Sequence, residues 1–537
     1  MNTYKKYLLI LCCQIIILFV FIYKTDLYEN AGFPLDDAWI HQSIAKNLGE
    51  HFELSFNRGE LTTGSTSLLW TVILALNFAF FKVNPVYYTL AINILLYFLT
   101  GFFLYKLLKE ETDELTTCII VILFSITGNV LFFMLSGMEV FLFYFLSIAS
   151  IYFFSEKKYI ITGLFCGFLA LTRPEGLGLF LILTIIGIYN LINKKEEKGI
   201  IFLIILPAIF FGISASINYY ISGSFLQSTF IGRRWLYELH DKSFYLDLNR
   251  AWEFICAWYF RIKQYTFGIN ESGSLLKNLF INGENYLLFF FLLIGFSGII
   301  KDGLFSKGSK KKGSIFLLFI WSLGLNLLYI IFLPALGHAG RYQPLNYLLL
   351  SLSMILGAKF TIEWLIKKRK IHTAAMSFVS LILTFIFLNN SLFWSDVTKV
   401  SIFHINNTHR EMALYLKKYI PADEKVAAFD IGAIKYFSNH NIVDLGGLID
   451  RCFIPYLLSG NPAPYLKSKG VKYIVLPYLY NEKTEIGWRL GLFKESSKIK
   501  LIKMKEFGTT KEIWESGIDA LYHADPKQVL LKIEYSN

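Results

Sequence analysis

Charged residues are scarce in this 537-residue chain, and their scarcity indicates its class. Only 17% of the residues are Asp, Glu, Lys or Arg, whereas 55% are hydrophobic and 17% are aromatic. The mean hydropathy is +0.48. A soluble globular domain carries about 25% charged residues. The composition therefore excludes an ordinary soluble protein and indicates a polytopic membrane protein.

Several familiar binding motifs are absent as well. The six cysteines show no CxxC spacing, and we interpret them as small buried hydrophobes without a disulfide framework. His41, His338 and His409 lack the spacing of zinc ligands. No GxGxxG sequence or P-loop is present, which argues against a nucleotide site.

Positive charge is in excess, with 52 Lys and Arg against 40 Asp and Glu and a formal net charge of +12. The basic runs lie between apolar stretches, for example at 194–198 and 307–312. Loops of this kind face the cytoplasm in membrane proteins. The positive charge therefore indicates membrane topology and does not predict binding to nucleic acid.

Apolar stretches predict the membrane-embedded part of the chain. They lie at about 8–23, 67–81, 85–105, 116–134, 139–154, 159–171, 176–192, 200–221, 285–300, 314–333, 344–366 and 373–394. If the basic loops all face the cytoplasm, the N-terminus can also lie inside only if one of the early apolar stretches does not cross the membrane. The stretch 67–81 is the best candidate, because it is short for a span. We predict eleven crossings over 1–394, a re-entrant or interfacial helix at 67–81, and outer loops at 24–84 and 222–284.

From about residue 395 the composition becomes that of a soluble domain. The pattern predicts strands at 426–430, 441–445 and 471–476 and helices at 404–420, 431–437 and 465–469. This alternation predicts a small α/β domain over 395–537. The topology count places that domain on the extracytoplasmic side.

The same count places a set of charged side chains on the outer face. They are Asp36, Asp37, Glu139, Arg173, Glu175, Arg233, Arg234 and Arg341. In an alternative topology, the stretch 159–171 is the one that does not cross the membrane, and Glu139 then lies on the cytoplasmic side. Charges beside a bilayer are costly and typical of functional sites, so these residues are the candidates for chemistry.

The adjacent Asp36 and Asp37 are the leading catalytic candidates. Asp37 would also suit the N-cap of a helix beginning at Ala38, an interpretation that leaves Asp36 unexplained. A carboxylate near a low-dielectric surface can have its pKa raised into the range of a general base, which would deprotonate an acceptor hydroxyl. Two carboxylates could instead hold a divalent cation such as Mg²⁺ or Mn²⁺, and the sequence does not decide whether a metal binds.

The segment 57–70 is dense in turn-forming and hydroxyl-bearing residues. Ser65 or Thr66 would cap the helix that follows. Alternatively, hydroxyls and N–H groups at a helix start would bind a phosphate or a sugar. The sequence favours neither interpretation.

The run FPLDDAWIHQSIAKNL, followed by LSFNRGE and TTGSTSLLW, resembles the first outer loop of GT-C-type membrane glycosyltransferases. That superfamily includes protein mannosyltransferases, lipid A aminoarabinose transferases and mycobacterial arabinofuranosyltransferases. Shorter sequence motifs also resemble this superfamily, and they occur in the same order along most of the chain. They are SGME at 136–139, LTRPEG at 171–176, GRYQP at 340–344, FDIGA at 429–433 and VDLGGL at 443–448.

The resemblance implies a GT-C fold and transfer of a sugar from a polyprenyl-phosphate donor to a glycan, lipid or protein acceptor. The reaction would occur on the outer face of a bacterial cytoplasmic membrane. The resemblance also implies that Asp36 is the catalytic base, with Asp37 beside it, in one inverting displacement.

A departing lipid phosphate needs its charge stabilised, and the planar guanidinium of arginine matches phosphate oxygens. Arg341 is our choice for this role, with snorkelling at the interface as the alternative. Arg233 and Arg234 lie beside Trp235, so they are either a second phosphate site or an anchor at the headgroups.

Three further charges have weaker assignments. Glu139 would suit a solvated helix N-terminus, or it would lie near the acceptor or Asp36. Arg173 and Glu175 flank Pro174, and an ion pair that holds the helix bundle together is the favoured interpretation over catalysis.

Other classes of function make different predictions. A transporter or flippase for a lipid-linked glycan would carry charges inside its spans and paired broken helices in two related halves. Here the apolar stretches are nearly free of charge. A non-catalytic scaffold and a ligase that moves whole lipid-linked glycans are further alternatives.

Overall fold

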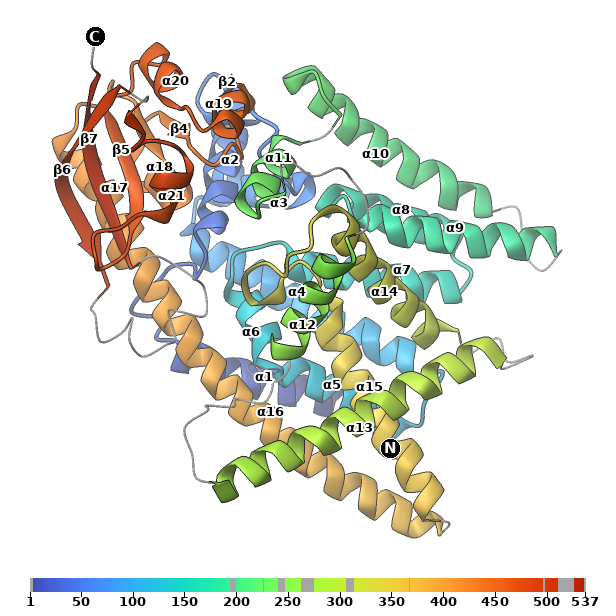
Figure 1. The fold of residues 1–537 in the computed structure, drawn as a ribbon. Helices are drawn as coiled ribbons and strands as arrows, with labels where there is room; N and C mark the ends of the chain where they lie inside the picture. The colour runs from blue at the N-terminus through green and yellow to red at the C-terminus, as the bar shows by residue number, and fades with distance from the viewer. Residues whose placement is uncertain are drawn as a thin grey trace.

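We analysed a computed structural model of the chain. The structure describes residues 3–193, 199–225, 227–239, 247–261, 275–305, 313–366, 368–495, 498–509 and 526–535. A large body of helices carries a smaller part built on a β-sheet at one corner (Figure 1). The short helices α2, α3 and α11 lie where the two parts meet.

Six described helices are long and apolar enough to cross a membrane. They are α1 (Thr3–Lys24), α4 (Pro85–Leu108), α10 (Ile200–Ser222), α14 (Ser314–Phe332), α15 (Leu345–Leu365) and a long helix that begins with α16 (Arg369–Ile405). The protein is therefore a multi-pass membrane protein.

Other apolar helices coincide with the remaining predicted stretches. They are α3 (Leu68–Leu76) with its extension η1 (Asn77–Phe81), α7 (Val140–Ser155), α8 (Tyr159–Thr172), α9 (Gly176–Ile192) and α13 (Leu275–Phe305). Several are shorter than the roughly 20 residues that a perpendicular span requires. The count of eleven crossings therefore stays a prediction.

The apolar stretch 116–134 is a bent pair of helices. α5 (Glu114–Ile126) and α6 (Gly128–Leu135) meet at an angle of 55°. At the break, the Gly128 N–H donates to Asn390 Oδ1 at 2.9 Å, because no helical carbonyl is available to it. In α6, Asn129 Nδ2 donates to Tyr347 Oη at 2.9 Å, and Tyr347 Oη donates to the Ala339 carbonyl at 2.8 Å. The break thus supports the turn η3 (His338–Gly340).

The last long helix connects the two parts of the protein. α16 continues through a π-helical turn, η4 (Asn406–Arg410), into α17 (Glu411–Tyr419). Figure 1 shows this helix running from the far end of the helical body to the sheet. The domain boundary predicted at residue 395 falls within it.

The C-terminal part contains a five-stranded sheet in the order β4-β3-β5-β7-β6. β3 (Val426–Ala428) lies between β4 (Ile442–Asp444) and β5 (Tyr473–Tyr478) and is parallel to both. β7 (Lys527–Tyr535) is antiparallel to β5 and to β6 (Ile499–Gly508). β3 and β4 are buried along their whole length, as strands of a parallel sheet covered on both faces are.

Short helices complete the connections between these elements. They are α11 (Ser228–Leu236), α12 (Leu248–Arg261), α18 (Gly432–Ser438), η5 (Arg451–Phe453), α19 (Ile454–Ser459), α20 (Ala463–Ser468) and α21 (Glu485–Arg489). The segment 431–437, predicted as a helix after the first strand, corresponds to α18. β6 and β7 were not predicted.

The segment 24–84, predicted above as the first outer loop and given that name below, packs against the C-terminal part. Its helix α2 (Asp36–His51) packs on α18, where the Trp39 ring lies 4.8 Å from Tyr436 and 4.7 Å from Phe437, centroid to centroid. The hairpin β1 (Ser55–Asn57) and β2 (Glu60–Leu61) follows. Asn57 Nδ2 donates to the Ile442 carbonyl at 2.9 Å, and the Ile442 N–H donates to Asn57 Oδ1 at 3.0 Å. The Asn57 amide thus pairs with the edge strand β4 as a further strand would.

We expect Asn57→Ala to lower the free energy of unfolding by about 2 kcal/mol, because it leaves a buried N–H and a buried carbonyl of Ile442 without partners. Thermal unfolding of the full chain in lipid nanodiscs measures the change. Asn481→Ala, in an exposed turn of the C-terminal part, is the control. Equal unfolding midpoints for the two variants would contradict the expectation.

Candidate active site

A cavity of about 710 Å³ lies where the helical body, the first outer loop and the C-terminal part meet. Five of the residues singled out from the sequence line it: Asp36, Asp37, Thr66, Arg233 and Arg341. They come from four separate segments of the chain. Its volume is typical of a site for a small molecule or part of a larger substrate.

Asp36 and Asp37 form the first turn of α2. The helix begins at Asp36, and its N-cap is Leu35, whose side chain makes no capping hydrogen bond. The interpretation of Asp37 as an N-cap is therefore wrong. The N-terminal end of a helix favours negative charge, and successive helical residues point about 100° apart, so the two carboxylates meet different partners.

The carboxylate of Asp36 binds the C-terminal part. Oδ2 accepts from the Gly432 N–H at 2.7 Å, and Oδ1 accepts from the Ala433 N–H at 2.8 Å. Burial raises the pKa of Asp36 to about 6, although His409 and the two N–H groups act in the opposite direction. A carboxyl group with this pKa is ionised at neutral pH and can still accept a proton.

The carboxylate of Asp37 forms an ion pair with Arg341. Burial alone would raise the pKa of Asp37, but the positive charge of Arg341 outweighs it and holds the pKa well below its ordinary value. Asp37 therefore remains an anion at any physiological pH. The two neighbouring carboxylates thus have pKa values on opposite sides of the ordinary value, a pattern typical of catalytic sites.

Arg341 is buried and only partly satisfied. Its side chain is 6% exposed, and Nη2 is occupied by Asp37. Nε and Nη1 are buried without a hydrogen-bond partner among the described residues. The Arg341 and Arg233 guanidinium carbons lie 5.5 and 5.2 Å from the centre of the Tyr342 ring. The guanidinium groups of Arg341 and Arg233 thus lie beside the same ring, and Arg341 has N–H donors without a partner. Such an arrangement is suited to binding an anion.

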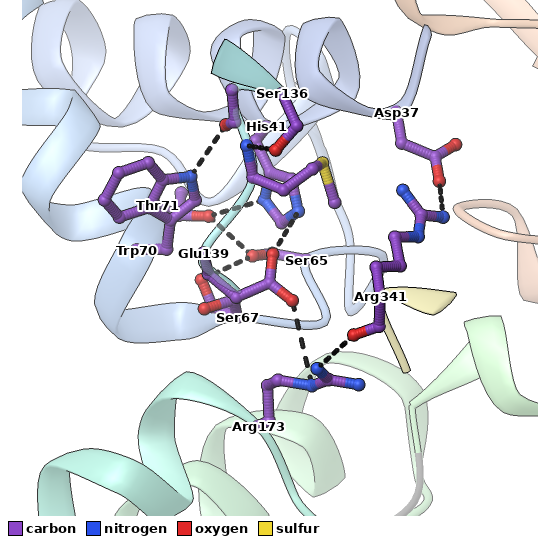
Figure 2. A network of polar contacts seen from close by, with 12 residues as sticks. Asp37, His41, Ser65, Ser67, Trp70, Thr71, Ser136, Glu139, Arg173 and Arg341 are labelled. Atoms are coloured by element: carbon purple, nitrogen blue, oxygen red, sulfur yellow. Dashed lines mark hydrogen bonds and ion pairs between the residues drawn. The ribbon is translucent and has the colours of Figure 1, made fainter. Parts of the chain in front are cut away.

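Behind the cavity, a buried polar network holds the backbone of Arg341 (Figure 2). Arg173 Nη1 donates to the Arg341 carbonyl at 2.9 Å, and Nη2 donates to Tyr329 Oη at 2.8 Å. Arg173 also lies 3.8 Å from Glu139 and 3.4 Å from Glu175. The favoured interpretation of Arg173 and Glu175 as a pair within the bundle agrees with this geometry.

The network continues from Glu139 toward the first outer loop. His41 Nε2 lies 4.0 Å from Glu139, and His41 Nδ1 lies 3.4 Å from Thr71 Oγ1. Ser65 Oγ is 2.6 Å from Thr71 Oγ1. Glu139 and Ser65 therefore lie behind the cavity wall, whereas Thr66 lines the cavity.

Only one of the paired arginines on α11 faces the cavity. Arg233 lines it. Arg234 instead donates to the Leu239 carbonyl at 2.7 Å and to the Phe332 carbonyl at 3.4 Å. Neighbouring residues on a helix point in different directions, so of the two arginines only Arg233 remains a candidate for binding phosphate, and Arg234 does not line the cavity.

The sequence did not predict a set of polar side chains, here called the polar wall, that the C-terminal part contributes to the cavity. It consists of His404, His409, Asp430 and Gln528. Asp430 belongs to the FDIGA sequence, which carried no assigned role, and no sequence signal identified Gln528. These residues become neighbours of Asp36 only through the tertiary fold.

A divalent cation remains a prediction from the sequence. Among the described residues, no three His, Cys, Asp or Glu side chains lie close enough together to hold a metal ion. Both oxygens of Asp36 accept from backbone N–H groups, and Asp37 faces Arg341. Oxygens of a substrate phosphate would have to complete the coordination of an ion held by these two residues.

Comparison with known proteins identifies the fold. None of the curated proteins matches the chain. A family described as a domain of unknown function (DUF8728) matches residues 401–520. Among solved structures, ArnT from Cupriavidus metallidurans bound to undecaprenyl phosphate is similar, with a TM-score of 0.52 and 9% identity over 99% of this chain and 98% of that chain.

The oligosaccharyltransferase of Archaeoglobus fulgidus, tethered with an acceptor peptide, is similar as well. Its TM-score is 0.52, with 11% identity over 86% of this chain and 69% of that chain. The chain has the GT-C fold. This confirms the fold that the resemblance in the sequence motifs implied. Because the identities are low, the similarity establishes the GT-C fold alone.

We expect Gly432→Ala to weaken the contact between α18 and α2. A Cβ at residue 432 would collide with the Asp36 carbonyl oxygen and lie 2.9 Å from Asp36 Oδ2. Such overpacking costs about 1–3 kcal/mol, and a lower midpoint of thermal unfolding would reveal it. Gly212→Ala is the control, since nothing lies within 4 Å of a Cβ there. An unchanged midpoint for Gly432→Ala would show that α18 does not approach Asp36 this closely.

Proposed function

We propose that the protein is a membrane glycosyltransferase of the GT-C type. It transfers a sugar from a polyprenyl-phosphate donor to an acceptor on the outer face of a bacterial cytoplasmic membrane. The observation that carries this proposal is the pair of unused, buried N–H groups of Arg341 in the cavity that Asp36 also lines. A donor phosphate would satisfy those groups, and the carboxylate would serve an attacking hydroxyl.

The proposed reaction is a single displacement. The acceptor oxygen forms a bond to the anomeric carbon as the bond from that carbon to the phosphate oxygen breaks. Asp36 takes the hydroxyl proton, and the departing lipid phosphate leaves with its negative charge. Arg341 and Arg233 stabilise that charge, which is greatest in the transition state and the product.

Asp37 has a different role from Asp36 in this scheme. Its ion pair fixes the orientation of Arg341, while Arg173 holds the Arg341 carbonyl from behind. The guanidinium group is therefore oriented before the donor arrives, which avoids a cost of ordering it during binding.

The molecules bound in the similar structures support a lipid-phosphate donor. ArnT was solved with undecaprenyl phosphate, and the archaeal oligosaccharyltransferase was solved with dolichol-phosphate and an inhibitory peptide. A transporter or flippase is less well supported. Such a protein would have paired broken helices, and among the described spans only α5 and α6 form a bent pair.

We expect Asp36→Asn to reduce sugar transfer by about 100- to 10,000-fold, the usual contribution of a general base. Donor binding should be retained, because the Arg341 site is unchanged. Transfer of radiolabelled sugar from polyprenyl-phosphate donors to membrane acceptors measures the loss. Asp423→Asn, at an exposed position of the C-terminal part, is the control. Full transfer by Asp36→Asn would remove this residue as the base.

The pH profile gives an independent test of Asp36. Its base form is the carboxylate, and its pKa is raised to about 6. In the wild type, kcat/KM should therefore be constant above pH 7 and fall as the pH drops through about 6. A profile without a fall between pH 7 and pH 5 would contradict this assignment.

We expect the double variant Asp37→Asn/Arg341→Gln to fold and to bind the donor at least about tenfold more weakly, since a charge-assisted hydrogen bond contributes about 1.5–3 kcal/mol. Removing both partners avoids an unpaired buried charge. Equilibrium binding of a sugar-bearing polyprenyl-phosphate donor measures the change. Arg58→Gln, in the exposed turn of the hairpin, is the control. Equal affinities would exclude Arg341 as the phosphate site.

A further inference from the structure

The polar wall formed by His404, His409, Asp430 and Gln528 has no role in the reaction as described. Its residues come from the end of α16, from η4, from the loop after β3 and from β7. It borders the same cavity as Arg233 and Arg341. The chemistry of its unpaired atoms indicates what it would bind.

Hydrogen bonds within the wall use its donors. Gln528 Nε2 donates to Asp430 Oδ2 at 2.8 Å and lies 3.2 Å from His409 Nε2. The Thr408 hydroxyl donates to the His404 carbonyl at 2.6 Å. Its oxygen, 2.7 Å from His409 Nδ1, therefore accepts the proton of that nitrogen.

Two buried polar atoms of the wall are left over. Gln528 Oε1, an acceptor, and His404 Nδ1 are buried and have no partner among the described residues. Gln528 is 1% exposed and His404 is 4% exposed. An unpaired buried polar atom costs about 1–3 kcal/mol, so a ligand that donates to the Gln528 oxygen and forms a hydrogen bond with the His404 ring would gain affinity here.

Asp430 adds a negative charge to this wall. Its carboxylate is 31% exposed. Burial raises the pKa of Asp430, but the hydrogen bonds and charge of its neighbours, His409 foremost, lower it below its ordinary value. The group is therefore an anion, and as a carboxylate it only accepts hydrogen bonds.

The wall lies next to the proposed base. The loop that begins at Asp430 continues to Gly432 and Ala433, whose N–H groups bind Asp36. The cavity thus has one side with guanidinium groups and another side with carboxylates, an amide oxygen and an imidazole nitrogen. An anion fits the first side, and a neutral molecule with several O–H groups fits the second.

We propose that His404, Asp430 and Gln528 form the acceptor subsite, and that the acceptor is a neutral sugar residue. This inference rests on the proposed glycosyl transfer. One hydroxyl of the acceptor sugar loses its proton to Asp36, while neighbouring hydroxyls donate to Asp430 and Gln528 and form a hydrogen bond with the His404 ring. A serine or threonine of a peptide offers a single hydroxyl, and a phosphorylated acceptor would be repelled by Asp36 and Asp430.

The test compares acceptors and variants on the full chain in nanodiscs with one labelled polyprenyl-phosphate donor. The acceptor probes are neutral methyl glycosides, the corresponding sugar phosphates and a serine-containing peptide. For the wild type we expect transfer to a neutral glycoside and at least about tenfold less to its phosphate. His404→Phe keeps an aromatic ring at the position that packs 5.5 Å from His409 and removes the ring nitrogens, and Gln528→Met removes the amide oxygen.

In each variant the KM for the glycoside should rise about tenfold, the effect of one lost hydrogen bond in a buried site, while the donor KM changes less than twofold. The matched control is Glu424→Gln, which breaks an exposed ion pair with Lys472 in the same part of the protein. An unchanged glycoside KM in both variants, or transfer to the peptide alone, would overturn the acceptor subsite. Wild-type protein that neither transfers nor hydrolyses any donor would instead overturn the glycosyltransferase function itself.

Discussion

The contact between the Asp36 carboxylate and the N–H groups of Gly432 and Ala433 is the interaction on which the rest of the site depends. It joins residues 396 positions apart in sequence, one on the first outer loop and one in the C-terminal part. Without this contact, the cavity would lose a wall and the proposed base would be exposed to water. The pairing of Asn57 with Ile442 fixes the same junction at the edge of the sheet.

A second consequence of this junction is that two adjacent carboxylates acquire different properties. α2 directs Asp36 toward uncharged N–H groups and Asp37 toward a guanidinium group. Burial therefore dominates for Asp36 and raises its pKa, whereas the ion pair dominates for Asp37 and lowers its pKa. One residue is suited to accept a proton and the other to hold a cation in position.

The sequence identified the part of the site that lies close to conspicuous motifs. Asp36, Asp37, Arg233 and Arg341 line the cavity. They could be identified because a charge at the end of an apolar span is costly and typical of a functional site. It could not separate Arg233 from Arg234, because side-chain direction depends on where the helix packs. Arg173, Glu175 and Glu139 were singled out as candidates from the predicted topology, but only the fold reveals that they support Arg341 from behind.

The C-terminal contribution was beyond reach from the sequence. The strand and helix pattern around 426–476 predicted an α/β arrangement, yet nothing in it indicates that Asp430 and Gln528 face the base. That proximity follows from β7 pairing with β5 and from the continuous helix α16–α17, both of which are long-range features. The break between α5 and α6 was also not predicted, although Thr127, Gly128 and Asn129 interrupt the apolar run at that point.

The most direct test of the account is a structure of the wild-type protein with polyprenyl phosphate bound, at a resolution that shows the phosphate oxygens. The account predicts the phosphate within hydrogen-bonding distance of Arg341 Nε or Nη1, beside Arg233, with Asp36 still held by Gly432 and Ala433. A phosphate bound elsewhere, with Arg341 contacting Asp37 alone, would contradict it.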